Sequence, residues 1–148
     1  MFAIDPPIVP LFLTAGSPIP SAKSASDGID FLTSFETALK KGELIEAIEF
    51  QVPQKSSYQK CPNPASRYAI VGVYVAKFKK ESNVAITGAE SVVFRCKKIE
   101  DALNSNFSSS AIEKVQINSS SFNSDIHASA EYRANLIKVF AKKAVEAC

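Results

Sequence analysis

Glycine is scarce in this chain of 148 residues. The five glycines stand at Gly16, Gly28, Gly42, Gly72 and Gly88, and no two of them are closer than 12 positions. The common phosphate-binding loops need glycines close together, as G-x-G-x-x-G for dinucleotides or G-x-x-x-x-G-K-[ST] for nucleoside triphosphates. Neither loop can be written anywhere in the sequence. A self-contained phosphate cradle of either kind is therefore excluded.

Side chains that bind soft metal ions are also few. The sequence holds three cysteines, Cys61, Cys96 and Cys148, and a single histidine, His127. A structural zinc site takes about four such ligands, commonly in C-x-x-C pairs, whereas these cysteines are 35 and 52 positions apart. We therefore expect no metal site. An odd number of widely spaced cysteines is also weak material for a disulfide framework, which favours reduced thiols and a cytoplasmic location.

Because His127 is the single histidine, any catalytic triad of the Ser/His/Asp or Cys/His kind must use it. It lies in the polar run 124–131, directly before a segment of helical pattern, where capping hydrogen bonds explain the polar cluster without any chemistry. The sequence thus predicts no catalytic residue. A free-standing hydrolase that pairs His127 with a serine is the weakest of the alternatives.

Charge and hydropathy narrow the class of protein further. With 17 basic and 15 acidic residues the net charge is +2, and the basic residues form no long block, so we expect no binding to nucleic acid. The longest apolar stretch near the start, residues 8–19, is broken by Pro10 and Pro18 and has no basic flank. It therefore predicts neither a membrane span nor a signal peptide.

The first half of the chain predicts strands rather than helices. Five of the eight prolines fall within residues 1–20, so residues 1–30 are expected to form an irregular, proline-rich arm. Residues 31–39 have an amphipathic spacing that is helical or irregular, and residues 43–52 alternate as a half-buried strand. A polar linker is expected over 54–66. Further strands are expected over three apolar stretches, residues 67–78, 84–88 and 92–96.

Helical patterns take over after residue 98. Short helices are expected over 99–103 and 108–115, and a long one over 128–147, where Tyr132, Leu136, Val139 and Phe140 recur at helical spacing. Ser129, or Asp125 just before it, can cap the first turn of the long helix. Strands followed by helices predict an α+β fold, in which helices cover one face of a small antiparallel sheet.

One local pattern suggests a ligand. Lys60 follows Tyr58 by two positions, and Tyr68 stands on the far side of a proline-containing loop, at the start of the most apolar strand. A cation and an aromatic ring on either side of a loop can together bind a planar, electron-rich molecule. The alternative is an ordinary loop with one snorkelling lysine and one interfacial tyrosine.

Several ordered motifs carry a resemblance to a known family. They are Y-Q-K-x-x-x-P-A-S-R-Y-A-I-V-G-V (58–73), V-A-I-T-G-A (84–89), S-D-I-H-A-S-A-E-Y-R-A-N-L-I (124–137) and, upstream, F-E-T-A-L-x-x-G-E-L-I (35–45). The last resembles the end of a flavin-binding domain. The other three resemble the C-terminal domain of the FAD-binding medium subunit in the carbon monoxide dehydrogenase and xanthine dehydrogenase family of molybdenum hydroxylases. The resemblance covers residues 30–147.

This resemblance implies a domain plan and a fold. Residues 1–30 would be the arm, residues 31–53 a remnant of the end of the FAD-binding domain, and residues 54–148 the C-terminal domain. That domain has three or four antiparallel strands followed by about three helices. The glycine-rich loops that hold the FAD pyrophosphate in the family are absent from this sequence, so the chain resembles a medium subunit that is truncated at its N-terminus.

The resemblance also implies a cofactor, contacts and partners. The family's flavin contacts map to Lys60 and Tyr68, and to Leu44 and Ile45, whose apolar side chains would pack beside the isoalloxazine ring. The chain would form one wall of an FAD site that passes electrons from iron-sulfur clusters to an acceptor. Its partners would be an iron-sulfur subunit and a large molybdenum-cofactor subunit, and the resemblance leaves a separate FAD-binding segment open as a third. The alternative is a docking or scaffolding fragment of such a complex that binds no flavin, encoded by a split or truncated gene.

Overall fold

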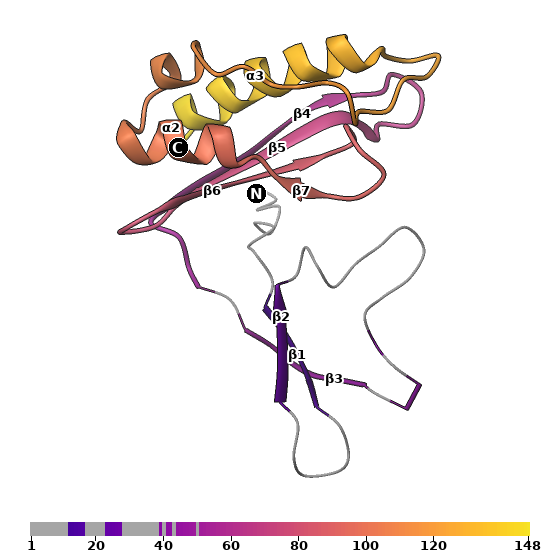
Figure 1. Ribbon diagram of the computed structural model, residues 1–148, viewed down its shortest axis with the longest axis vertical. Coiled ribbons are helices and arrows are strands. Elements are labelled where there is room, and N and C mark those ends of the chain that lie inside the picture. Colours follow the sequence, from indigo (N-terminus) through magenta and orange to yellow (C-terminus); the bar gives the residue numbers. More distant parts are fainter. Residues whose placement is uncertain (1–11, 17–22, 28–38, 40, 43, 50) are drawn as a thin grey trace, which may run out of the picture. The chain divides into compact units, whose positions relative to one another are not determined.

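The computed structural model describes residues 12–16, 23–27, 39, 41–42, 44–49 and 51–148 (Figure 1). The chain divides into two compact units, an N-terminal unit within Ile8–Val52 and a C-terminal unit that comprises Pro53–Cys148. Each unit is described by itself. Among the described residues, no helix has the length and apolar character needed to cross a membrane.

The N-terminal unit contains a three-stranded antiparallel sheet in the order β2-β1-β3. Its strands are β1 (Phe12–Gly16), β2 (Lys23–Asp27) and β3 (Leu44–Glu49). β3 confirms the strand expected over 43–52. The prediction of an irregular arm over residues 1–30 is wrong where β1 and β2 form. The prolines lie before and after β1 in the sequence, and prolines outside a strand do not remove its ladder hydrogen bonds. The amphipathic segment expected over 31–39 lies outside the described residues except for Leu39.

The C-terminal unit is built on a four-stranded antiparallel sheet in the order β4-β5-β6-β7. The strands are β4 (Lys55–Pro62), β5 (Ala69–Lys77), β6 (Ser82–Thr87) and β7 (Phe94–Arg95). The last three confirm the expected strands. The prediction of a polar linker over 54–66 is wrong, because residues 55–62 form β4. This strand pairs with β5 from Lys55 opposite Lys77 to Pro62 opposite Ala69. An edge strand with exposed side chains needs few apolar residues, which is why its sequence resembles a linker.

Helices cover one face of this sheet (Figure 1). They are α2 (Lys97–Ser105), the 3-10 helix η1 (Ser109–Ile112) and α3 (Ala130–Glu146). The core lies between them and the sheet, where Val73, Val75 and Ile86 are fully buried against apolar side chains of the helices. The α+β class and the order of strands and helices expected from the sequence are therefore confirmed. The segment expected as a helix over 108–115 has one short 3-10 turn instead.

The long helix begins as expected but presents a different face. Ser129 is its N-cap, and its hydroxyl oxygen accepts a hydrogen bond from the Tyr132 backbone N–H at 3.2 Å. Of the residues that recur at helical spacing, Tyr132 and Val139 are 49% and 38% exposed. The buried face of α3 is rotated from the expected one and comprises Arg133, Leu136, Ile137, Ala141, Ala144 and Val145.

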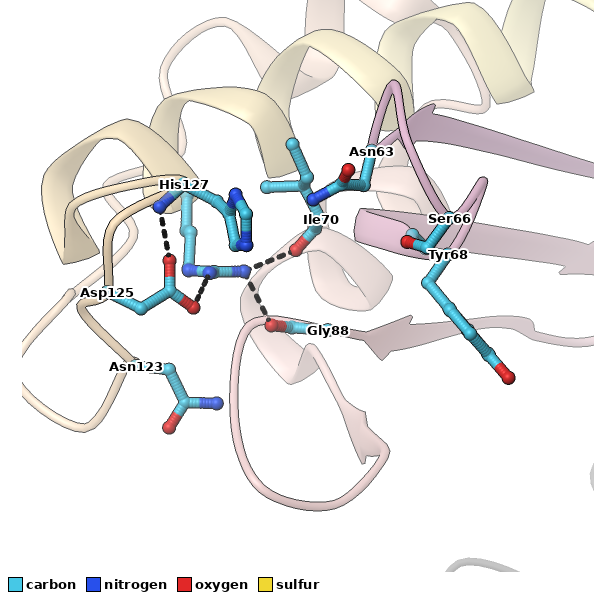
Figure 2. A pocket seen from close by; sticks show the side chains of 10 residues that line it. Asn63, Ser66, Tyr68, Ile70, Gly88, Asn123, Asp125 and His127 are labelled. Atoms are coloured by element: carbon cyan, nitrogen blue, oxygen red, sulfur yellow. Dashed lines mark hydrogen bonds and ion pairs between the residues drawn. The ribbon is translucent and has the colours of Figure 1, made fainter.

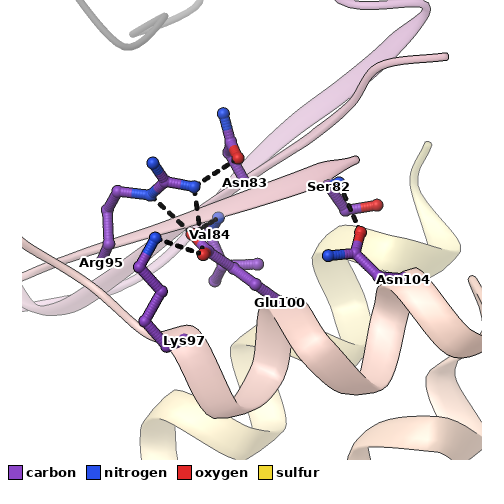
Figure 3. Close-up of polar contacts among 7 residues, drawn as sticks. All are labelled: Ser82, Asn83, Val84, Arg95, Lys97, Glu100 and Asn104. Carbon is purple, nitrogen blue, oxygen red and sulfur yellow. Dashed lines mark hydrogen bonds and ion pairs between the residues drawn. The ribbon is translucent and has the colours of Figure 1, made fainter. Parts of the chain in front are cut away.

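A buried carboxylate ties α2 to the sheet (Figure 3). Glu100 Oε1 accepts hydrogen bonds from the Val84 backbone N–H at 2.9 Å and from Arg95 Nε at 2.8 Å, and Oε2 accepts from Arg95 Nη2 at 3.1 Å. The Glu100 side chain is only 4% exposed, whereas Arg95 is 23% exposed. One helix side chain therefore satisfies both the backbone of β6 and the cation of β7.

We expect Glu100→Ala to lower the free energy of unfolding by about 2–3 kcal/mol, because it leaves the Val84 N–H without an acceptor and the Arg95 guanidinium with Asn83 Oδ1 alone. Urea unfolding followed by circular dichroism measures the change. Asp101→Ala is the matched control, since Asp101 is an exposed acid on the same helix. Equal stability of the two variants would show that the Glu100 interactions contribute nothing net.

Candidate functional site

A pocket of about 290 Å³ lies at one end of the sheet in the C-terminal unit (Figure 2). Three segments form it: the β4–β5 loop with the start of β5, the end of β6, and the loop that leads into α3. Most of the lining groups can form hydrogen bonds. The lining residues are Asn63, Ser66, Tyr68, Ala69, Ile70, Gly88, Asn123, Asp125, His127 and Arg133.

Arg133 joins these three segments from the first turn of α3. Its Nη1 donates to the backbone carbonyls of Ile70 at 2.6 Å and Gly88 at 2.9 Å, and its Nη2 donates to Asp125 Oδ2 at 2.7 Å. These contacts are the dashed lines that run to the Ile70 and Gly88 oxygens and to one Asp125 oxygen in Figure 2. Arg133 is only 4% exposed. The pocket wall is thus held by a buried guanidinium whose charge is balanced by one carboxylate.

No sequence pattern singled out Arg133 as a site residue. The signal was nevertheless present, because Arg133 precedes Leu136 by three positions and Ile137 by four, which places all three on one helical face.

Asp125 shapes the loop before α3. Its Oδ1 accepts from the backbone N–H groups of His127 at 2.9 Å and Ala128 at 3.0 Å, while its own N–H donates to the Ala128 carbonyl at 3.1 Å. The hydrogen bond from the His127 N–H is the largest effect that lowers the pKa of the Asp125 carboxyl, and the Ala128 N–H and the Arg133 cation lower it further. Asp125 therefore closes this loop, and Ser129 is the helix cap.

This lowered pKa predicts how stability depends on pH. The folded state favours the Asp125 carboxylate, so its contribution is present above the usual aspartate pKa of about 3.9 and is lost as the pH falls through the lower folded-state pKa. Melting curves should show a steeper fall in midpoint below about pH 4 for the wild type than for Asp125→Asn. Parallel curves for the two proteins over that range would contradict this role of Asp125.

His127 lines the pocket without a triad. Asp125 accepts a hydrogen bond from the His127 backbone rather than from its ring. Within the described residues, no hydrogen bond joins the imidazole to a serine hydroxyl or to a carboxylate. The geometry therefore gives no support to the hydrolase alternative.

Lys60 and Tyr68 lie at the same end of β4 and β5. The loop between them is closed by hydrogen bonds from the Asn63 N–H to the Tyr68 carbonyl at 2.7 Å and from the Arg67 N–H to the Asn63 carbonyl at 2.9 Å. Tyr68 is 80% exposed, and in Figure 2 its phenol extends away from Asp125 and His127. Lys60 is exposed and pairs with Gly72. The loop thus presents one cation and one aromatic ring to an incoming ligand.

The two other expected contacts belong to the N-terminal unit. Leu44 and Ile45 are the first two residues of β3, and Leu44 is 59% exposed. Their role beside a flavin ring stays a prediction.

Comparison with known proteins identifies one fold. No protein-family model matches the chain, and no curated protein matches it. A solved chain from quinoline 2-oxidoreductase of Pseudomonas putida 86 is similar to it, with a TM-score of 0.68 and 18% sequence identity over 94% of this chain. The match spans 52% of that solved chain, so this protein corresponds to about half of its length. At this identity the likeness shows a shared fold.

Proposed function

We propose that this chain is part of the flavin subunit of a molybdenum hydroxylase and forms one wall of an FAD site. The observation that carries the proposal is the placement of Lys60 and Tyr68, both exposed, on the two sides of one loop, in a fold shared with a chain of an oxidoreductase. The motifs of residues 58–73 and 124–137 add support. The first forms β4, the loop and β5, and the second holds Asp125 and Arg133 against the start of β5.

The chemistry of these side chains fits the ring of a flavin rather than its phosphates. Lys60 offers an ammonium that can donate to a ring carbonyl oxygen or nitrogen, and Tyr68 offers a π face and a hydroxyl. No glycine-rich loop for a pyrophosphate exists in the sequence. When bound, FAD would supply the electron transfer between iron-sulfur clusters and an acceptor. The residues of this chain would orient the ring and keep water from one of its sides.

The proposed partners follow from this role. An iron-sulfur subunit would deliver electrons, a large molybdenum-cofactor subunit would bind the substrate, and a separate segment would supply the missing pyrophosphate loops. The chain alone is not expected to be an active enzyme, because two contacts cannot offset the cost of ordering a large dinucleotide. The second candidate function is a flavin-free docking module in the same kind of complex.

Substitution of the two side chains tests the first candidate. In a fluorescence titration of the full chain, or of its complex with partner subunits, Lys60→Ala and Tyr68→Ala should each weaken flavin binding about three- to tenfold. Tyr68→Phe should bind nearly as well as the wild type because it keeps the ring. Lys79→Ala and Tyr132→Ala are matched controls at exposed positions. Unchanged affinity in both site variants would show that Lys60 and Tyr68 do not contact the flavin, and a wild type that binds no flavin would favour the docking module.

A further inference from the structure

The sheet of the C-terminal unit has a second face, away from the helices. Residues directly opposite each other in antiparallel strands share a face, and so do residues two positions apart in one strand. Tyr58 pairs with Tyr74, Lys60 pairs with Gly72, and Gly72 pairs in turn with Thr87 of β6. These side chains therefore lie together. Val73 and Val75 point to the opposite face, where they join the core under the helices.

Gly72 makes room for the Tyr58 phenol on this second face. A Cβ atom at position 72 would lie 2.9 Å from Tyr58 Cζ, 2.8 Å from Thr87 Cγ2 and closer still to the Tyr58 hydroxyl oxygen. No side chain fits in that space while the phenol occupies it. The phenol thus reaches from the edge strand β4 across β5 toward β6.

Glycine in the interior of a central strand is costly, because it packs no side chain and adds conformational freedom to the unfolded chain. It often marks a place where a ligand or another backbone approaches closely. Gly72 lies within a run of buried residues, Val71–Ala76, that otherwise consists of valine, alanine and tyrosine. Its φ angle is not positive, so the backbone conformation does not require glycine there. The contact that does require glycine is the one with Tyr58.

The Tyr58 ring is held but not covered. Its phenol packs over Gly72, yet the residue remains 38% exposed, and burial of the hydroxyl end raises its pKa, so the ring stays neutral at physiological pH. Lys60 stands two positions further along β4, about 7 Å away along the strand, on the same face. A neutral aromatic surface and a cation are thereby placed side by side on a rigid sheet.

We propose that Tyr58, seated over Gly72, is the platform on which the planar ring of a flavin stacks, with Lys60 at the edge of that ring. The inference rests on the proposed function and adds a contact that the sequence did not assign. A planar heteroaromatic ring with carbonyl groups on its rim matches both chemistries, because its face stacks on the phenol while its rim accepts a hydrogen bond from the ammonium. Gly72 is then a positioning residue, since it acts through Tyr58.

The test is a titration of the full chain, or of its complex with partner subunits, with FMN and with FAD, followed by quenching of flavin fluorescence. Tyr58→Leu and Gly72→Ala should each weaken binding about three- to tenfold and reduce the quenching. Tyr58→Phe should restore both, which separates the ring from the hydroxyl. Tyr132→Leu is the control for loss of an exposed tyrosine on α3. Circular dichroism and melting curves verify that each variant is folded.

The outcomes separate this inference from the proposed function. If Lys60→Ala and Tyr68→Ala weaken flavin binding while Tyr58→Leu leaves affinity and quenching unchanged, the proposed stacking on Tyr58 is wrong. The proposal that this chain forms one wall of an FAD site is then still supported. If Tyr58→Phe is as weak as Tyr58→Leu, stacking is not the contact and the proposal is also overturned. If the wild-type chain binds no flavin by itself or in its complex, both proposals fail.

Discussion

Arg133→Ala is expected to lower the free energy of unfolding of the C-terminal unit by about 3–5 kcal/mol. The substitution removes three hydrogen bonds at once and takes the Arg133 donor away from the Ile70 and Gly88 carbonyls and from Asp125 Oδ2. Two of those groups are backbone carbonyls, one at the start of β5 and one just after β6, and the guanidinium that they bind is only 4% exposed. Buried polar groups left without partners carry their full desolvation cost.

Urea unfolding at neutral pH measures this effect. Arg133→Lys keeps the charge but not the forked geometry that reaches two carbonyls and a carboxylate, so it should recover only part of the loss. Lys142→Ala is the matched control, because the ion pair of Lys142 with Glu113 is partly exposed and contributes at most about 1 kcal/mol. A change below about 1 kcal/mol for Arg133→Ala would contradict the role of Arg133 as the clamp of the pocket wall.

Gly88→Ala should destabilise the same unit by about 3 kcal/mol or more. Gly88 has φ of +82°, a left-handed conformation in which a side chain is strained. In addition, its Cβ would lie 2.6 Å from the Ile70 carbonyl oxygen and 2.7 Å from that of Ala69. Both are backbone atoms at the start of β5, so the clash is relieved only if the strand or the turn moves. Such a movement would also disturb the carbonyls that Arg133 binds.

Gly42→Ala separates the backbone strain of a positive φ from the clash of the new Cβ atom with neighbouring atoms. Gly42 has φ of +89°, but a Cβ atom there would meet nothing within 4 Å. It should therefore cost only the backbone strain of about 1–2 kcal/mol. Thermal melting of both variants checks the difference. A Gly88→Ala protein no less stable than Gly42→Ala would show that the β5 backbone yields to the new methyl group at little cost.

The elements that the sequence predicted well are those with a strong local pattern. β5 is a continuous run of apolar residues whose side chains are buried or half-buried, and such a run is visible without knowledge of its partners. α3 is long and capped by Ser129, so its beginning and its type were both visible. β4 was missed because an edge strand needs no apolar alternation, and Pro62 at its end added to the appearance of a linker.

The residues of the candidate site also differ in how well the sequence predicts them. Lys60 and Tyr68 were visible because they flank one loop in sequence. Arg133 was missed because its partners Ile70 and Gly88 are 63 and 45 positions away, and no local pattern shows a bond of that range. The contact between Tyr58 and Gly72 depends on the register of two strands, which places Lys60 opposite Gly72. Register becomes visible only when the strands are paired.

The visible absorption spectrum of this chain, purified together with its partner subunits, shows directly whether the chain forms part of an FAD site. We expect flavin absorption bands that remain after gel filtration and are lost or strongly reduced when Lys60 and Tyr68 are both replaced by alanine. A complex that assembles fully and shows no flavin band would contradict this expectation, and the chain would then be a docking module without a cofactor.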